Sequence, residues 1–245
     1  MLFCLNLQPM CQFMGNIYMS RNYFFGFVLV ALLAGCANNA EKPNVPKEQK
    51  REKTTPSPDK EKAKTIVFYG NSITAGYGVD PTEAFPAQVQ NKIDSLQLPY
   101  KVVNAGLSGE TSAGGLSRID WILRQPVDIF VLELGGNDGL RGIPLAATEK
   151  NLQAIIEKVK TKYPSAKIIL AGMQIPPNMG RKYTTEFREL FQQLASKNNI
   201  ILIPFLLEHV GGIPSLNQGD GIHPNPEGHK IVADNVWKVL QGLVQ

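Results

Sequence analysis

The sequence has few cysteines, and none of them lies beyond residue 36. The three cysteines all fall within the first 36 residues, so residues 37–245 contain no thiol. Disulfides, zinc–thiolate sites and a cysteine nucleophile are therefore excluded from that part of the chain. Histidine is equally scarce, and the three in the chain are His209, His223 and His229. A general base of the commonest kind has to come from this short set.

Most of the chain also lacks an excess of charge. The formal net charge is +4; Arg21 and residues 41–64, which hold eight Lys or Arg and five Asp or Glu, account for all of it. Residues 65–245 are therefore neutral. A domain that binds nucleic acid normally carries a basic excess on its folded part. We therefore expect no nucleic-acid partner.

An apolar stretch near the N-terminus is too short to cross a bilayer, which needs ~20 residues. Residues 23–35 (YFFGFVLVALLAG) form a run of 13 residues between Arg21 and Cys36. This length and these flanks are typical of the apolar region of a secretory signal. We predict a signal segment over residues 1–35. Since the first 18 residues carry no charge, Met19 is the better start.

Large apolar side chains are nearly absent from residues 37–64, which mix Pro, Lys, Glu, Thr and Ser. A segment of this composition cannot bury enough apolar surface to offset the entropy that it loses on ordering. We predict a disordered tether over residues 36–64 and one folded domain over residues 65–245.

The predicted domain alternates short apolar runs with longer amphipathic ones. The short runs are rich in β-branched residues and lack strict alternation, which is typical of buried parallel strands; they cover residues 65–70, 101–106, 129–136, 167–172 and 200–205. The longer runs predict helices over residues 84–97, 111–125, 144–163, 183–199 and 225–244. Five strand–helix units in strict alternation predict an α/β fold, a three-layer αβα arrangement around a doubly wound, five-stranded parallel sheet of the flavodoxin-like type.

Residues with catalytic chemistry follow four of the predicted strands. Ser72 follows the first strand, Gly109 the second and Asn137 the third, and Asp220 and His223 lie beyond the fifth. In a doubly wound sheet, ligands bind beyond the carboxyl ends of the strands. We therefore expect these five residues to lie at one site.

Acyl transfer to a serine needs these residue types. A serine hydroxyl needs a base within hydrogen-bond reach, and imidazole, with an ordinary pKa of ~6.5, suits that role. A carboxylate on the other ring nitrogen fixes the tautomer, and the spacing of Asp220 and His223 allows this contact within a turn. The oxyanion needs hydrogen-bond donors, for which the backbone N–H groups of Ser72 and Gly109 and the amide of Asn137 are candidates.

Each of these fragments also has an ordinary structural explanation. Serine and asparagine are common in turns and helix caps, and Asp220 with His223 could form a polar turn. Asn137 could be a left-handed turn residue, and Gly109 could be a helix-entry glycine. The convergence of four such fragments, in order, at the ends of predicted strands favours catalysis.

Patterns for metals and common cofactors are missing. No group of His, Asp and Glu has the spacing of metal ligands, and the glycines around Ser72 follow neither the dinucleotide-binding nor the phosphate-loop spacing. The G-x-S-x-G pentapeptide of lipase-type α/β-hydrolases is absent as well. We expect no cofactor and no metal.

Four fragments, GNSITAGYG, NAGLSGETS, LGGNDGLRG and DGIHPNPEG, resemble the four sequence blocks of the SGNH (GDSL) hydrolases. Residues 133–142 and 173–183 most resemble the bacterial branch of multifunctional acyl-thioesterases, lysophospholipases and arylesterases. The resemblance implies the SGNH hydrolase fold, with Ser72 as nucleophile, His223 as base and Asp220 orienting the base. It also implies that Gly109 and Asn137 complete the oxyanion hole.

The resemblance also implies a substrate class, with one departure from the family pattern. The family usually has Asp where this chain has Asn71, so a charge beside Ser72 is lost. The expected substrate-binding residues are Asn71, Leu140, Ile143, Ile175 and Pro176. We expect a carboxylic ester hydrolase that acts on fatty-acyl or aryl esters and thioesters, including lysophospholipids. A carbohydrate O-acetylesterase is the enzymatic alternative, and a catalytically silent, lipid-tethered binding module is the alternative without activity.

The stretch LLAGC (32–36) resembles the lipobox of bacterial lipoproteins. This resemblance implies cleavage before Cys36 and attachment of lipid to it. We expect an exported monomer anchored to the bacterial envelope, at the outer membrane or the periplasmic face if the cell has two membranes. The alternative is an ordinary signal peptide in which Cys36 is incidental.

Overall fold

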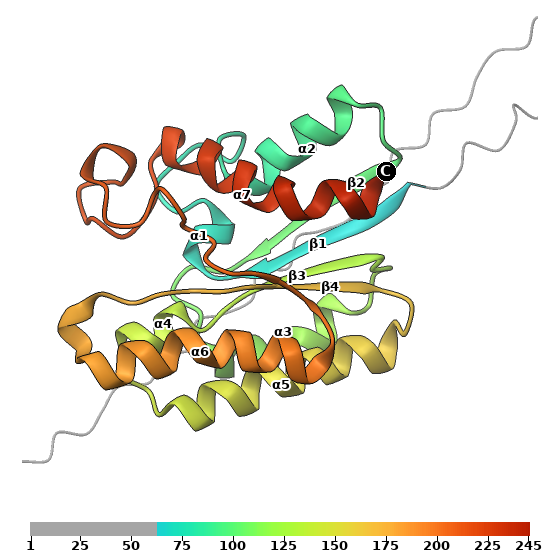
Figure 1. Ribbon diagram of the computed structural model, residues 1–245. Coiled ribbons are helices and arrows are strands. Elements are labelled where there is room, and N and C mark those ends of the chain that lie inside the picture. The colour runs from blue at the N-terminus through green and yellow to red at the C-terminus, as the bar shows by residue number, and fades with distance from the viewer. Residues whose placement is uncertain (1–62) are drawn as a thin grey trace, which may run out of the picture. The chain divides into compact units, whose positions relative to one another are not determined.

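The computed structural model describes residues 63–245, and a sheet of five parallel strands organises them (Figure 1). The sheet order is β2-β1-β3-β4-β5, and every neighbouring pair is parallel. The predicted α/β fold with a doubly wound five-stranded sheet is therefore confirmed. The strands are β1 (Lys64–Gly70), β2 (Tyr100–Gly106), β3 (Ile129–Glu133), β4 (Lys167–Ala171) and β5 (Ile201–Ile203).

Helices cover both faces of the sheet, as Figure 1 shows. The chain adds β2 on one side of β1 and then returns to add β3 on the other side. Because crossovers between parallel strands are right-handed, this reversal sends the helices to opposite faces. One face carries α2 (Phe85–Ser95) and α7 (Pro226–Val244), and the other carries α3 (Ser112–Ile122), α5 (Leu145–Lys162) and α6 (Arg181–Asn198).

Shorter elements lie in the loops between these layers. Two short helices, α1 and α4, follow β1 and β3 at the carboxyl edge of the sheet, meaning the edge where the strands end (Figure 1). The short elements are α1 (Ser72–Ala75), α4 (Gly136–Leu140) and the 3₁₀ turns η1 (Pro177–Met179) and η2 (Pro214–Leu216).

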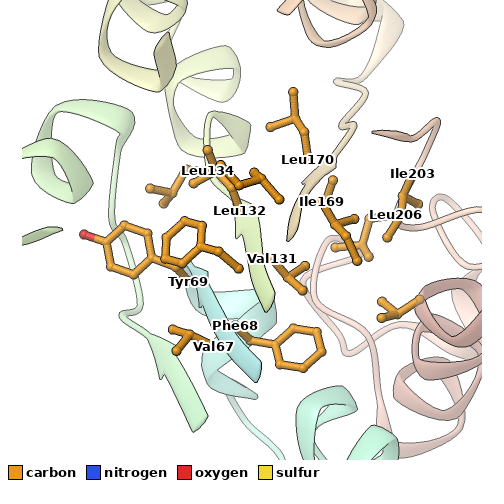
Figure 2. Close-up of a cluster of buried hydrophobic side chains, with 14 of the residues drawn as sticks. Val67, Phe68, Tyr69, Val131, Leu132, Leu134, Ile169, Leu170, Ile203 and Leu206 are labelled. Atoms are coloured by element: carbon orange, nitrogen blue, oxygen red, sulfur yellow. The ribbon is translucent and has the colours of Figure 1, made fainter. Parts of the chain in front are cut away.

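The core consists of apolar side chains from both faces of the central strands (Figure 2). Successive residues of β1 point to opposite faces. The Phe68 ring packs against Phe85 of α2, with 5.3 Å between the ring centroids. Tyr69 points the other way and donates a hydrogen bond of 2.5 Å to the carbonyl of Gly115 in α3. Since helices cover both faces, the central strands are apolar at nearly every position.

Two predicted strands end at least two residues later than those in the structure. The run predicted as a strand over residues 129–136 ends at Glu133, because Gly135 has a φ of +102° and turns the chain into α4. The run predicted over residues 200–205 is a strand only at Ile201–Ile203, where Pro204 follows and has no N–H to donate to a neighbouring strand.

The N-terminal predictions meet the structure only at their edge. Lys64, predicted as the last tether residue, belongs to β1 because it pairs with Tyr100 of β2. The rest of the predicted tether, the predicted signal segment with Met19, and Cys36 lie outside the described residues. Among residues 63–245, no helix combines the length and the apolar character needed to cross a membrane.

Candidate active site

Ser72 is the first residue of a capped turn that follows β1. Asn71 caps α1, because its side-chain Oδ1 accepts a hydrogen bond of 3.0 Å from the backbone N–H of Ile73. The other end of α1 is closed by Gly76, which has a φ of +76°. The two caps fix the backbone on both sides of Ser72.

Asp220 and His223 share a turn near the C-terminus. One carboxylate oxygen of Asp220 accepts hydrogen bonds from the backbone N–H groups of Ile222 (3.0 Å) and His223 (3.1 Å). The other oxygen lies 2.6 Å from Nδ1 of His223. Burial raises the pKa of Asp220, but the hydrogen bonds from His223 and these N–H groups outweigh burial and lower it to about 2. The carboxylate therefore stays ionised at neutral pH and holds a proton on Nδ1.

The structure brings the imidazole to the serine. With its Nδ1 proton directed at Asp220, the ring presents Nε2 as an acceptor, and Nε2 lies 2.9 Å from Oγ of Ser72. The Tyr77 ring packs against the imidazole, with 4.8 Å between ring centroids. Ser72, His223 and Asp220 thus form a continuous chain of hydrogen bonds, an arrangement that can activate a serine nucleophile.

Two further loops supply hydrogen-bond donors. Gly109 has a φ of +79°, a conformation that glycine adopts without strain. The N–H groups of Ser72 and Gly109 donate no hydrogen bond within residues 63–245. The side-chain amide of Asn137 donates one of its two protons to the carbonyl of Glu110 in a hydrogen bond of 3.0 Å. The second proton remains for an oxyanion.

One ion pair and several hydrogen bonds of buried carboxylates hold these two donor loops together. Asp138, next to Asn137, accepts hydrogen bonds from the N–H (2.8 Å) and Oγ (2.5 Å) of Ser112 at the start of α3. Glu110, next to Gly109, pairs with Arg118 of α3. Both carboxylates are buried. The loops carrying Gly109 and Asn137 are therefore fixed to the same helix.

A cavity of about 370 Å³ adjoins Ser72 and His223. Of the residues predicted to bind substrate, four line it: Asn71, Leu140, Ile175 and Pro176. The prediction for Ile143 is corrected, because this residue is not part of the cavity wall. Ile143 follows a turn at Gly142 (φ +64°), and its carbonyl accepts a hydrogen bond of 2.7 Å from the Tyr183 hydroxyl.

The sequence reasoning missed much of the apolar wall. Met173 follows β4, and Phe205 and Leu207 follow β5, and all three line the cavity. Their positions at the carboxyl edge of the sheet were a usable signal, because the same rule located Ser72 and Asn137. Glu133 was missed as well, although a carboxylate at the end of the apolar run IFVLE is unusual.

The other two histidines do not take part in this arrangement. His229 is buried between α7 and α2, and its Nδ1 accepts a hydrogen bond of 3.2 Å from the N–H of Phe85. His209 is exposed and does not line the cavity. Within residues 63–245, no three His, Cys, Asp or Glu side chains gather where they could hold a metal ion.

Comparisons with known proteins show to which family the chain belongs. The family model described as "GDSL-like Lipase/Acylhydrolase family" matches residues 68–231. The chain is similar to Esterase TesA of Pseudomonas aeruginosa, with 39% identity over 183 residues that cover 74% of this chain and 90% of the relative. It is similar to Thioesterase 1/protease 1/lysophospholipase L1 of Escherichia coli K12, with 40% identity over 74% of this chain and 86% of the relative.

A solved esterase structure is similar to this chain in its fold. The psychrotrophic esterase EstA from Pseudoalteromonas sp. superposes with a TM-score of 0.69 at 34% identity, over 73% of this chain and 97% of that chain. The chain belongs to the GDSL-like lipase/acylhydrolase family and is a carboxylic ester hydrolase.

Proposed function

We propose that the chain hydrolyses fatty-acyl esters and thioesters, lysophospholipids among them, through an acyl-enzyme formed on Ser72. One observation carries the proposal: the hydrogen-bonded chain of Ser72, His223 and Asp220 opens onto a cavity with a mostly apolar wall. A cavity of about 370 Å³ is within the size range of pockets that take small ligands.

The reaction would proceed in two halves. His223 Nε2 accepts the proton of the Ser72 hydroxyl while Oγ attacks the substrate carbonyl carbon. The N–H groups of Ser72 and Gly109 and the Asn137 amide donate hydrogen bonds to the oxygen that becomes negative. The imidazolium then protonates the departing alcohol or thiol, which leaves the acyl group on Oγ. Water then attacks the acyl carbon while Nε2 accepts its proton. The bond from the acyl carbon to Oγ breaks, the imidazolium returns the proton to Oγ, and the carboxylic acid is released.

Exposed apolar side chains around the cavity support a lipid substrate. Seven large apolar side chains are exposed in residues 63–245, and five of them lie in loops at the carboxyl edge of the sheet: Tyr77, Leu107, Leu140, Ile213 and Ile222. The other two, Leu96 and Trp121, lie at the C-terminal ends of α2 and α3 and so at the opposite edge. Exposed apolar groups gathered around a site favour contact with a lipid surface over contact with a sugar.

The nucleophile is tested with a fluorophosphonate probe and with p-nitrophenyl butyrate. We expect the wild type to be labelled and to turn over the ester, and Ser72→Ala to do neither. His209→Ala is the control, since that side chain is exposed and outside the cavity wall. Labelling of the Ser72→Ala variant at the wild-type rate would contradict the assignment, and an unlabelled, inactive wild type would support the binding-module alternative.

The substrate class is tested with acetyl, butyryl and palmitoyl esters of one alcohol and with a lysophospholipid. We expect kcat/KM to rise from acetyl to the longer chains, because the wall is apolar. Leu140→Ala should lower kcat/KM for the longer esters, and Ile143→Ala should leave it unchanged, because only Leu140 lines the cavity. A preference for acetyl esters of carbohydrates would contradict the proposal.

The five exposed apolar side chains at the carboxyl edge of the sheet are called the rim here. Their contribution is tested with vesicles that contain lysophospholipid. Leu107→Ser and Ile213→Ser should reduce hydrolysis in vesicles while leaving turnover of soluble p-nitrophenyl butyrate intact. Leu96→Ser and Trp121→Ser are matched controls, because these side chains are 53% and 66% exposed but lie at the other edge. Equal loss in all four variants would count against a lipid-facing rim.

We also propose that the enzyme is an exported monomer with a lipid anchor at Cys36. The support is the stretch LLAGC, the apolar run before it and the polar residues 37–64 after it. Mass spectrometry of the purified full chain should find a diacylated N-terminal Cys36 and no residues before it. Cys36→Ser should shift activity from the membrane fraction to the soluble fraction. Light scattering of the solubilised protein should give the mass of one chain.

A further inference from the structure

A carboxylate outside the hydrogen-bonded triad of Ser72, His223 and Asp220 contacts the turn of residues 71–76, which we call the nucleophile turn. Glu133 is the last residue of β3, and its side chain is buried from solvent. Carboxylates are rarely buried without strong partners, because transfer from water costs the charged form several kilocalories per mole. The partners of Glu133 therefore identify its purpose.

Those partners are Asn71, directly before Ser72, and Thr74, two positions after it. Oε1 of Glu133 accepts a hydrogen bond of 2.6 Å from the side-chain amide of Asn71. Oε2 accepts hydrogen bonds from the backbone N–H of Asn71 (3.0 Å) and from Oγ1 of Thr74 (2.7 Å). Glu133 thus holds both ends of the short segment that presents Ser72.

The amide of Asn71 is divided between two tasks. Its oxygen accepts the N–H of Ile73 and so caps α1, and its nitrogen donates to Glu133. Exchange of the two amide atoms would break both contacts, so the orientation of Asn71 is fixed by its neighbours. Ser72 lies in the chain between Asn71 and Ile73. The direction of its Oγ toward His223 therefore depends on the two contacts of the Asn71 amide.

We propose that Asn71 and Glu133 form a buried positioning pair that orients Ser72 toward His223. The role rests on the proposed function, because it concerns the reactivity of Ser72. Glu133 does not touch the reacting atoms of the acyl transfer. Asn71 contacts one of them, because its Oδ1 accepts a hydrogen bond of 3.4 Å from Oγ of Ser72, and the effect of the pair passes through this contact and through the turn. Burial raises the pKa of Glu133 to about 7, against the lowering effect of the hydrogen bonds from Thr74 and Asn71. The backbone N–H and the side-chain amide of Asn71 can donate to Glu133 whether its carboxyl is ionised or protonated. In the protonated form, the carboxyl proton can lie between Oε2 and Oγ1 of Thr74.

The pair is matched as one amide and one acid, which makes the proposal testable by exchange. In Glu133→Gln, the new amide nitrogen has to face either the N–H or the amide of Asn71, so two donors oppose each other. In Asn71→Asp, two carboxylates meet at the position of the 2.6 Å contact and must share one proton. In the double variant Asn71→Asp/Glu133→Gln, the glutamine amide can donate to the aspartate and its oxygen can accept the backbone N–H.

The experiment measures kcat and KM of the four proteins on p-nitrophenyl butyrate from about pH 6 to about pH 10. We expect Glu133→Gln to lower kcat by about tenfold or more with KM nearly unchanged, because a misdirected nucleophile affects the chemical step. The double variant should recover most of that loss. The ratio of kcat in Asn71→Asp to kcat in the wild type should fall as pH rises, because loss of the shared proton leaves two like charges in contact.

A change in folding has to be separated from a change in positioning. The unfolding midpoint of each variant is measured at each pH, and Asn199→Asp serves as a charge control, because this exposed residue caps the far end of α6. The pair is rejected if the double variant is no more active than Glu133→Gln, or if the kcat ratio of Asn71→Asp does not change with pH. If the wild type itself does not hydrolyse esters, the proposed function fails, and recovery of the unfolding midpoint in the double variant still tests the pair.

Discussion

Nε2 of His223 lies 2.9 Å from Oγ of Ser72, although 151 positions separate the two residues in the chain. Ser72 follows the first strand of the sheet, and His223 lies in the loop between the last strand and the last helix. Both loops leave the same edge of the sheet, because all five strands are parallel. The topology of the sheet therefore brings the two loops together, and a turn in each loop directs its side chain toward the other.

Asp220→Asn should lower kcat on p-nitrophenyl butyrate by roughly 10²- to 10⁴-fold. The carboxylate holds the proton of His223 on Nδ1, and an amide in its place no longer selects that tautomer. Because the pKa of Asp220 is lowered to about 2, its titration lies well below the pH of the assay, and its loss should lower kcat across the whole neutral range. A variant with wild-type kcat at neutral pH would show that His223 is oriented by other contacts.

Asn137→Ala should lower kcat by roughly 10²- to 10³-fold and change KM little, because the amide donor is needed only when the carbonyl oxygen becomes negative. Steady-state kinetics on the soluble ester measure both constants. Asn198→Ala is a suitable control, since that residue makes its hydrogen bonds within α6 and to α5, away from the cavity. A rise in KM with kcat intact would assign Asn137 to ground-state binding instead.

The stability of the fold should fall in mild acid because of His229. Burial, with a smaller contribution from His223, lowers the pKa of His229 to about 4. The unfolded chain takes up the proton near pH 6.5 and the folded chain does so only near pH 4, so the stabilisation is full above about 6.5 and declines as pH falls. The decline should reach on the order of 3 kcal/mol near pH 4. Urea unfolding at several pH values measures it.

The matching variant for this prediction is His229→Asn, whose side-chain oxygen can accept the N–H of Phe85 in place of Nδ1. This variant should have a flatter dependence of unfolding free energy on pH between about 4 and 6.5, whatever its stability at neutral pH. An unchanged slope would mean that other groups cause the acid sensitivity.

Gly70→Ala should destabilise the fold by about 1–3 kcal/mol, as overpacking in a core does. A Cβ at Gly70 would lie 2.1 Å from Oγ1 of Thr74 and 2.4 Å from Oε2 of Glu133. Gly242→Ala in α7 is the matched control, because a Cβ there meets open space and alanine favours a helix by up to about 1 kcal/mol. Thermal or urea unfolding of the two variants should show opposite signs. Equal stability of both would mean that the nucleophile turn adapts easily.

The alternation of apolar runs was sufficient to predict the sheet, because buried parallel strands and amphipathic helices have different periodicities. The limits of α5, predicted over residues 144–163, are Leu145–Lys162 in the structure. The errors came where backbone geometry changes within an apolar run. The run from Ile129 continues past Glu133 to the apolar Leu134, and the positive φ of Gly135 then turns the chain into α4.

By itself, the sequence determined the fold class and which residues of suitable chemistry follow the strands. Those features depend on local periodicity and on which side chains follow a strand, and both can be read along the chain. The tertiary structure alone decided that Glu133 lies beneath Asn71, that Phe205 and not Ile143 borders the cavity, and that His229 is buried against Phe85. Each of these contacts depends on packing between segments far apart in the chain. Local sequence patterns do not show which distant segments meet.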